Sequence, residues 1–167
     1  MFFKEQIMKQ LGETTVREYM TEQATVVDDT ARLTVAIRTM NDQRLSVMPV
    51  VDEQGELVGI LSNSDLMSMM HEIQSDLGAL NQVNDKTRDF LIQLLMEQGD
   101  HTLVRDVMTA PVETIHADAN LVVAARVLND MRYHHLPVVC SDNKTIGIIS
   151  TSDFVRAIAE NGALATG

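Results

Sequence analysis

One seven-residue phrase occurs twice in the chain and carries the residues with the clearest chemistry. It reads "GILSNSD" from Gly59 to Asp65 and "GIISTSD" from Gly147 to Asp153. In each copy a serine precedes the aspartate by three residues at the expected start of a helix, where unpaired backbone N–H groups and the helix dipole favour acceptors. An ionised carboxylate only accepts hydrogen bonds. It can therefore cap the helix or bind two adjacent hydroxyl groups of a ligand.

The phrase is the end of a longer internal repeat. Residues 16–70 align without a gap with residues 104–158, so that "VREYMT" matches "VRDVMT" and "MPVV" matches "LPVV". Such a duplication predicts two copies of one architecture. A single copy is too small to bury a stable core. We therefore expect the two copies to pack sheet against sheet about a pseudo-twofold axis.

Each copy reads as a β-α-β-β-α unit of an α/β (α+β) fold. The β-branched segments "ATVV" and "ETIH" are strand candidates, and Thr30 and Asp118 are expected to cap the helices that follow. Later strands are predicted over 47–52, 57–61, 136–140 and 146–149. The predicted helix faces have helical spacing and are formed by Leu33, Ala36, Ile37 and Met40 and by Leu121, Ala124, Ala125 and Leu128.

Two segments lie outside the repeats. Residues 1–15 read as an amphipathic helix, and residues 71–103 as a helical connector between repeat 1 (16–70) and repeat 2 (104–160). The connector has two interpretations. It is either a dimer contact or a helical cover for the sheet.

Composition excludes several classes of protein. The formal net charge of -11 disfavours nucleic-acid binding, and no apolar run is long enough for a membrane span or a signal peptide. We therefore expect a cytoplasmic protein. Cys140 is the only cysteine and reads as a small buried hydrophobe. The sequence shows no nucleophile elbow, phosphate-binding loop or metal motif, which argues against an enzyme.

The order of these segments, found twice at fixed spacing, resembles the cystathionine β-synthase (CBS) domain family. The resemblance covers the chain except for the N-terminal helix and the connector. It implies a tandem pair, often called a Bateman module, that binds adenosine-containing ligands in two clefts between the repeats. Such pairs commonly dimerise and regulate other proteins. They are not themselves catalysts.

The resemblance also implies site residues, with the adenine in an apolar slot of one repeat and the ribose on the aspartate of the other. One cleft would combine Thr14, Val16 and Val50 with Ser150, Thr151 and Asp153. The mirror cleft would combine Thr102, Val104 and Val138 with Ser62, Asn63 and Asp65. The valines would be core residues in any interpretation of this fold.

The two copies differ where a phosphate would bind. Repeat 2 has Arg132, His134 and His135 before its "LPVV", whereas repeat 1 has only Arg44 at the matching place. A phosphate needs such donors in an acidic chain. The alternative is a pair of surface histidines without a ligand. A metal site is disfavoured because adjacent strand residues point to opposite faces.

These features predict a stand-alone regulatory module that binds AMP, ADP, ATP or S-adenosylmethionine, requires no cofactor, and signals to a separate, unidentified protein. The alternative is an assembly module with vestigial clefts. We also expect a homodimer, because the first helices of both repeats present an apolar face that one chain covers only in part. This face includes Leu33, Ile37, Met40, Val122, Ala125 and Leu128 or their neighbours.

Overall fold

The computed structural model describes residues 2–77, 101–142 and 144–164 and shows a mixed α+β protein with two sheets. The chain divides into two compact units. Unit 1 comprises Met1–Ala24 with Glu113–Gly167, and unit 2 comprises Thr25–Val112. These units do not coincide with the sequence repeats. The first residues of each repeat, 16–24 and 104–112, are called its head here, and each head packs in the unit built on the other repeat.

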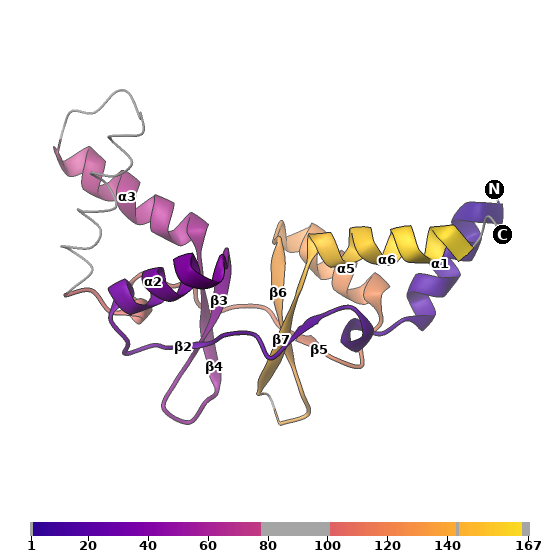
Figure 1. Cartoon of the computed structure of the whole chain (residues 1–167), viewed down its shortest axis with the longest axis horizontal. Coiled ribbons are helices and arrows are strands. Elements are labelled where there is room, and N and C mark those ends of the chain that lie inside the picture. Colours follow the sequence, from indigo (N-terminus) through magenta and orange to yellow (C-terminus); the bar gives the residue numbers. More distant parts are fainter. Residues whose placement is uncertain (1, 78–100, 143, 165–167) are drawn as a thin grey trace. The chain divides into compact units, whose positions relative to one another are not determined.

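Unit 1 contains a four-stranded sheet in the order β1-β7-β6-β5 (Figure 1). Its central strands β6 (His135–Val139) and β7 (Thr145–Ser150) are antiparallel. The short strand β5 (Ile115–His116) runs parallel to β6. On the other edge, β1 (Thr21–Glu22) pairs antiparallel with β7.

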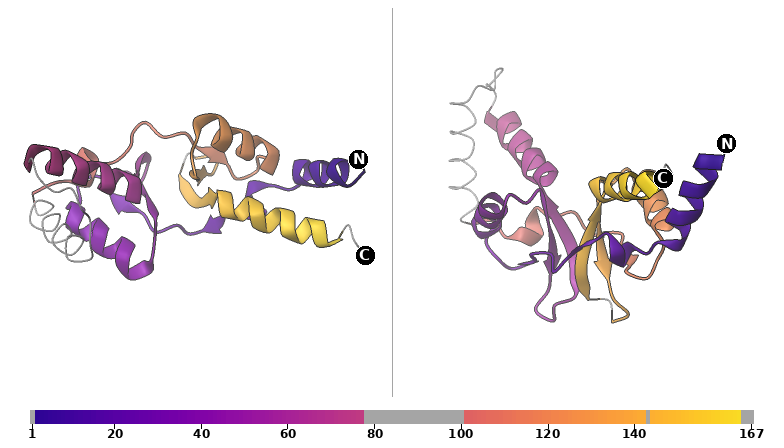
Figure 2. Two further views of the ribbon diagram at one scale, coloured as in Figure 1. Left: turned by 90° about the horizontal axis from the view of Figure 1, so that it is seen from above. Right: turned by 45° about the vertical axis from the view of Figure 1, so that its right-hand side comes forward.

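Helices cover one face of this sheet. Helices α5 (Leu121–Met131) and α6 (Thr151–Leu164) lie side by side, and α1 (Phe2–Glu13) contacts both of them (Figures 1 and 2). The 3₁₀ turn η1 (Val16–Glu18) follows α1. The core between helices and sheet consists of buried aliphatic residues, among them Leu121, Leu128, Leu136, Val138, Ile149 and Ala157.

Unit 2 repeats this plan with a three-stranded sheet in the order β2-β3-β4. Leu33, Ala36 and Met40 of its first helix pack against Met48, Val50 and Leu61 of its strands. Its elements are β2 (Val27–Asp28), α2 (Leu33–Gln43), β3 (Val47–Val51), β4 (Leu57–Ser62), α3 (Asn63–Leu77) and η2 (Val104–Asp106).

The expected β-α-β-β-α order is therefore confirmed in both units, but the expected helix caps are wrong. The N-cap residues are Arg32 and Asn120, two positions after Thr30 and Asp118. Asn120 caps with its side chain, and Arg32 makes no side-chain cap bond. Thr30 instead donates from its N–H and its hydroxyl to Asp28, which ends β2. It therefore shapes the turn before the helix and not the helix itself.

The head of each repeat adds to the sheet of the other repeat by equivalent backbone pairing. Thr21 pairs with Ile148 in β7, and Thr109 exchanges two hydrogen bonds of 2.9 and 3.0 Å with Ile60 in β4. The heads also bind the other repeat at their 3₁₀ turns, η1 and η2. There the Val16 N–H donates to the carbonyl of Ala119 at 2.8 Å. Each sheet is thus joined by a segment that is distant in sequence, 127 positions from Thr21 to Ile148 and 49 from Ile60 to Thr109.

The glycine of the repeated phrase makes this exchange possible. A Cβ on Gly147 would lie closer to the carbonyl oxygen of Thr21 than real Cβ atoms come to any neighbour. A Cβ on Gly59 would meet the sulfur of Met108 at 2.5 Å and the carbonyl oxygen of Thr109 at 3.0 Å. Glycine is therefore required here because another backbone lies against the strand.

Parts of the expected connector lie outside the described residues. Helix α3 runs through to Leu77, and residues 78–100 are not described, so the predicted helices and dimer contact there stay predictions. Within the described ranges, no helix combines the length and the apolar character that crossing a bilayer requires.

The structure corrects the composition of the expected apolar face. Leu33, Met40 and Leu128 are 0%, 3% and 4% exposed, because they belong to the cores of their own units. Large apolar side chains are instead exposed at other positions of helices α2, α3, α5 and α6. They include Val35, Met67, Val123, Met131, Val155 and Ile158.

Candidate functional site

The Asp153 carboxylate lies at the junction of β7 and α6 in unit 1. Its Oδ2 atom accepts hydrogen bonds from the Ser150 N–H at 2.8 Å and from the Ser150 hydroxyl at 2.7 Å. Its Oδ1 atom accepts from Nη2 of Arg156 at 3.2 Å. The residue is only 8% exposed. The carboxylate is therefore fixed in position by three donors.

The Asp65 carboxylate occupies the equivalent place between β4 and α3 in unit 2. Its Oδ2 atom accepts from the Ser62 N–H at 2.7 Å and from the Ser62 hydroxyl at 2.6 Å. Its Oδ1 atom accepts from the hydroxyl of Thr109 at 2.7 Å. Thr109 belongs to the exchanged head segment. The two turns therefore share the serine contacts but differ in the partner of Oδ1.

Both aspartates thus cap their helices, as one of the two interpretations of the phrase expected. Capping does not use their full acceptor capacity. Oδ2 of each carboxylate carries two hydrogen bonds, and Oδ1 carries one, so one lone-pair direction of Oδ1 remains for a further donor. A ligand hydroxyl can bind there without breaking the cap.

The candidate residues next to the two aspartates bind the neighbouring strands through their backbones. The N–H of Thr151 donates to the carbonyl of His134 at 3.1 Å, and the N–H of Asn63 donates to the carbonyl of Ser46 at 3.0 Å. His135 pairs with Ser150 across β6 and β7. Each turn is therefore joined to the start of the neighbouring strand.

His135 is a half-buried histidine beside the Asp153 turn. Burial lowers its pKa below the ordinary value, and the neighbouring His134 acts in the same direction. The charge of Asp153 opposes both effects by raising the pKa of His135. The imidazole is therefore less basic than a free histidine, but a second negative charge nearby would favour its protonation.

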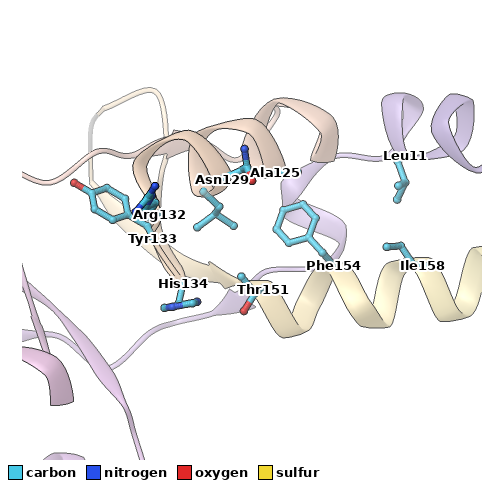
Figure 3. A pocket seen from close by; sticks show the side chains of 10 residues that line it. Leu11, Ala125, Asn129, Arg132, Tyr133, His134, Thr151, Phe154 and Ile158 are labelled. Carbon is cyan, nitrogen blue, oxygen red and sulfur yellow. The ribbon is translucent and has the colours of Figure 1, made fainter.

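The other two candidates of the basic cluster lie at a different place. Arg132, His134 and Thr151 line a pocket of about 510 Å³ in unit 1, with an apolar wall that includes Phe154 and Ile158 (Figure 3). His135 is not among its lining residues. His134 lies just before β6 and His135 is its first residue, and only His134 lines the pocket.

The remaining candidates are placed as follows. The carbonyls of Thr14 and Thr102 accept from the N–H groups of Leu121 and Leu33, which begin helices α5 and α2. All four candidate valines are 0% exposed within the cores. Val16 and Val138 lie in unit 1, and Val50 and Val104 in unit 2.

Sequence reasoning missed three residues that reach the aspartate turns. Thr109 donates to Asp65, and Arg156 binds both Asp153 and the carbonyl of Tyr19. Thr109 could have been noticed, because the heads "VREYMT" and "VRDVMT" both end in threonine. Arg156 and Tyr19 carry no such signal, since repeat 1 has serine and repeat 2 has valine at the matching positions.

No group of three or more histidine, cysteine, aspartate or glutamate side chains suited to a metal ion occurs among the residues for which the structure gives a placement. Cys140 lies just beyond the end of β6 and is half-buried, whereas the sequence predicted a buried residue.

Comparison with known proteins agrees with this architecture. The CBS domain family model matches residues 16–72 and 104–160. The chloroplastic CBS domain-containing protein CBSX1 of Arabidopsis thaliana is 34% identical over 152 residues, which cover 87% of this chain and 64% of CBSX1. The chain therefore corresponds to less than two thirds of this relative. The prediction of a cytoplasmic location stays a prediction.

Solved structures show the same fold. The crystal structure of Arabidopsis CBSX2 in complex with AMP has a TM-score of 0.67 and 28% identity, and the match covers 88% of this chain and 97% of the CBSX2 chain in the crystal. The CBS domain of a membrane protein from Sphaerobacter thermophilus has a TM-score of 0.72 and 24% identity, over 92% of this chain and 93% of that one. At this identity the second match bears on the fold alone. The two matched segments cover most of the chain, and it therefore belongs to the CBS domain family.

Proposed function

We propose that this protein is a regulatory module and not an enzyme. It binds an adenosine-containing ligand at each aspartate turn and passes its occupancy to a separate protein. A ribose hydroxyl donates to the free acceptor direction of Asp65 or Asp153, and no cofactor is required. The ligand class is AMP, ADP, ATP or S-adenosylmethionine.

The observation that carries this proposal is the free acceptor capacity of two equivalent, fixed carboxylates. Asp65 and Asp153 are oriented by serine donors in the same way, although they belong to different units. A carboxylate only accepts and is therefore suited to a hydroxyl donor, and dinucleotide-binding folds use an acidic residue for ribose in this way. The relative CBSX2, whose crystal structure contains AMP, supports adenosine as the ligand class.

The exchanged heads supply a way to transmit occupancy. The hydroxyl of Thr109 and the Arg156 side chain, which holds Tyr19, occupy the same carboxylate oxygens that a ribose would approach. A bound ligand therefore competes or cooperates with the docking of a head on its sheet. Such a differential interaction shifts the population of head conformations, which a partner protein can recognise.

A thermal-shift panel tests the ligand class. Adenosine, AMP, ADP, ATP and S-adenosylmethionine are compared with ribose 5-phosphate, which has the sugar and phosphate but no adenine. A ligand that binds the folded state raises the apparent melting temperature with concentration. We expect at least one adenosine compound to do so and ribose 5-phosphate to have no effect. A panel without any shift contradicts the proposal.

The exposed apolar side chains favour a second role as an assembly module. Val155 on α6 is 68% exposed, and Val35 on α2 is 53% exposed. Apolar side chains that gather on the helices are typical of a protein interface. We propose a homodimer that uses these helices. If the dimer forms but no adenosine compound binds, assembly with vestigial clefts becomes the better account.

A further inference from the structure

We propose that the two aspartate turns select ligands of different charge: the Asp153 turn an anionic adenine nucleotide, and the Asp65 turn a neutral or cationic adenosyl compound. This inference rests on the proposed function and specifies the ligand of each site. Arg156 is the residue that sets the difference.

Arg156 is held by several contacts within unit 1. Its Nη2 atom donates to Asp153 Oδ1 at 3.2 Å and to the carbonyl oxygen of Tyr19. Its guanidinium lies over the Tyr19 ring, 5.6 Å from the ring centre. The Tyr19 hydroxyl in turn donates to Glu160 at 2.9 Å. The guanidinium is therefore oriented before any ligand binds.

This contact changes the charge that a ligand meets at the turn. Asp153 is 8% exposed, so its field is screened less by solvent than that of a surface carboxylate. An unpaired carboxylate in this place would repel a phosphate attached to the same ribose. The guanidinium compensates the charge of Asp153, and Oδ1 still has a lone pair for a ribose hydroxyl.

Two histidines adjoin this turn through their backbones. His135 pairs with Ser150, whose N–H and hydroxyl bind Asp153, and the carbonyl of His134 accepts from Thr151. Protonation of a histidine near a bound phosphate would add a further charge-assisted donor.

The Asp65 turn has no such compensation. Its Oδ1 partner is the neutral hydroxyl of Thr109. In the ranges that the structure describes, Asp65 forms no ion pair. The sequence alignment shows the same contrast at three basic positions, although Arg132 has a basic counterpart in Arg44. His134, His135 and Arg156 of repeat 2 correspond to Ser46, Val47 and Ser68 of repeat 1.

The acidic neighbour does not cancel this contrast. Glu160, which accepts from Tyr19, corresponds in the alignment to Glu72, so both repeats carry glutamate one turn after the Arg156 or Ser68 position. This glutamate therefore does not distinguish the two repeats. A negative ligand is favoured at Asp153, and a positive one is tolerated better at Asp65.

Arg156 could instead serve only to clamp the Tyr19 segment onto its sheet. A clamp and a charge selector predict different results. Loss of a clamp would disturb the turn and weaken neutral adenosine and anionic AMP alike. Loss of a charge selector weakens AMP much more than adenosine, so the ratio of their dissociation constants separates the two roles.

Calorimetry on single-site proteins measures this ratio. Asp65→Ala leaves only the Asp153 turn, and Arg156→Ser, Arg156→Lys or Arg126→Ser is then added. Arg126→Ser is the matched control, because Arg126 is an exposed arginine on α5 of the same unit. Circular dichroism and melting temperature confirm that each variant is folded.

We expect Arg156→Ser to weaken AMP about tenfold, the effect of losing a charge-assisted contact, while adenosine changes less than about threefold. Arg156→Lys keeps most of the AMP preference, and Arg126→Ser keeps all of it. Equal losses for AMP and adenosine, or no loss of AMP, would overturn the proposal.

The reciprocal change tests the other turn. Asp153→Ala leaves only the Asp65 turn, where we expect S-adenosylmethionine to bind at least as tightly as AMP. Ser68→Arg places a guanidinium three residues after Asp65 and should raise the preference for AMP about tenfold. An Asp65 turn that already prefers AMP over adenosine contradicts the inference.

These outcomes are separate from a failure of the proposed function. If wild-type protein binds no adenosine compound, the proposed function fails and this inference fails with it. If binding depends on Asp153 but the AMP to adenosine ratio is the same in Arg156→Ser, only the charge inference fails.

Discussion

Replacing Gly147 by alanine tests whether the exchanged head closes the sheet of unit 1. The new Cβ would overlap the carbonyl oxygen of Thr21 in β1, and the sulfur of Met20 would lie 3.1 Å away. The methionine side chain can move, but the backbone oxygen moves only if β1 shifts and its pairing with β7 weakens. Overpacking typically costs 1–3 kcal/mol, and a backbone clash belongs near the upper end, at about 2–3 kcal/mol. For a protein of this size that corresponds to a melting temperature roughly 5–10 °C lower.

Urea unfolding followed by circular dichroism measures the loss against two controls. Gly12→Ala is the matched control, because no atom lies within 4 Å of a Cβ there, and we expect no loss of stability. Gly59→Ala should cost less than Gly147→Ala, since its nearest atom is the movable sulfur of Met108, at 2.5 Å. A Gly147→Ala protein as stable as Gly12→Ala would refute the role of the glycine in head docking.

Three further predictions concern charge, assembly and backbone strain. The pKa of His135 is lowered in the folded state, so the unfolded chain takes up the proton first and the free energy of unfolding falls as the pH drops below about 6.5. His135→Gln should reduce that fall between pH 7.5 and 5.5, and a variant with the wild-type pH profile would contradict this role of His135. Light scattering at micromolar concentration should give twice the 18.6 kDa mass of one chain, and a monomer mass with and without nucleotide removes the dimer. Arg44 has a left-handed φ of 55° at the end of α2. Arg44→Gly should therefore raise the free energy of unfolding by about 0.5–1 kcal/mol in urea titrations. A destabilised variant would show that the arginine makes a compensating contact.

The secondary structure could be predicted because its signals are local and occur twice. The helical spacing of Leu33, Ala36 and Met40 recurs in Leu121, Ala124 and Leu128, and all six side chains are buried. The strands around the two "PVV" segments fall within one residue of their predicted bounds. Agreement between two copies of one pattern removes most of the ambiguity that a single short strand leaves.

The head exchange could not be predicted in this way. Strand β1 has only two residues, and its partner Ile148 lies more than a hundred positions further along the chain. Nothing in the sequence around Thr21 shows which of the two similar strands, β4 or β7, this segment joins. The glycines gave a partial signal, because Gly59 and Gly147 indicated a close approach without showing that a backbone makes it.

The contacts of the two aspartates were predictable only where the repeats agree. The serine bonds to Asp65 and Asp153 follow from the repeated S-x-x-D pattern. Arg156 escaped notice because comparison of the repeats emphasises shared residues, and the matching residue in repeat 1 is Ser68. The charge difference between the turns depends on that departure from the repeat.

Titration of adenosine into wild-type protein and into the two single-site proteins tests the central claim most directly. Asp65→Ala and Asp153→Ala should each remove a different site, so each variant binds fewer adenosine molecules per chain than wild-type protein. Ser62→Ala and Ser150→Ala are the matched controls, because each removes a capping hydroxyl and keeps the carboxylate. We expect both serine variants to retain the wild-type number of sites. Undiminished adenosine binding in both aspartate variants would contradict the account.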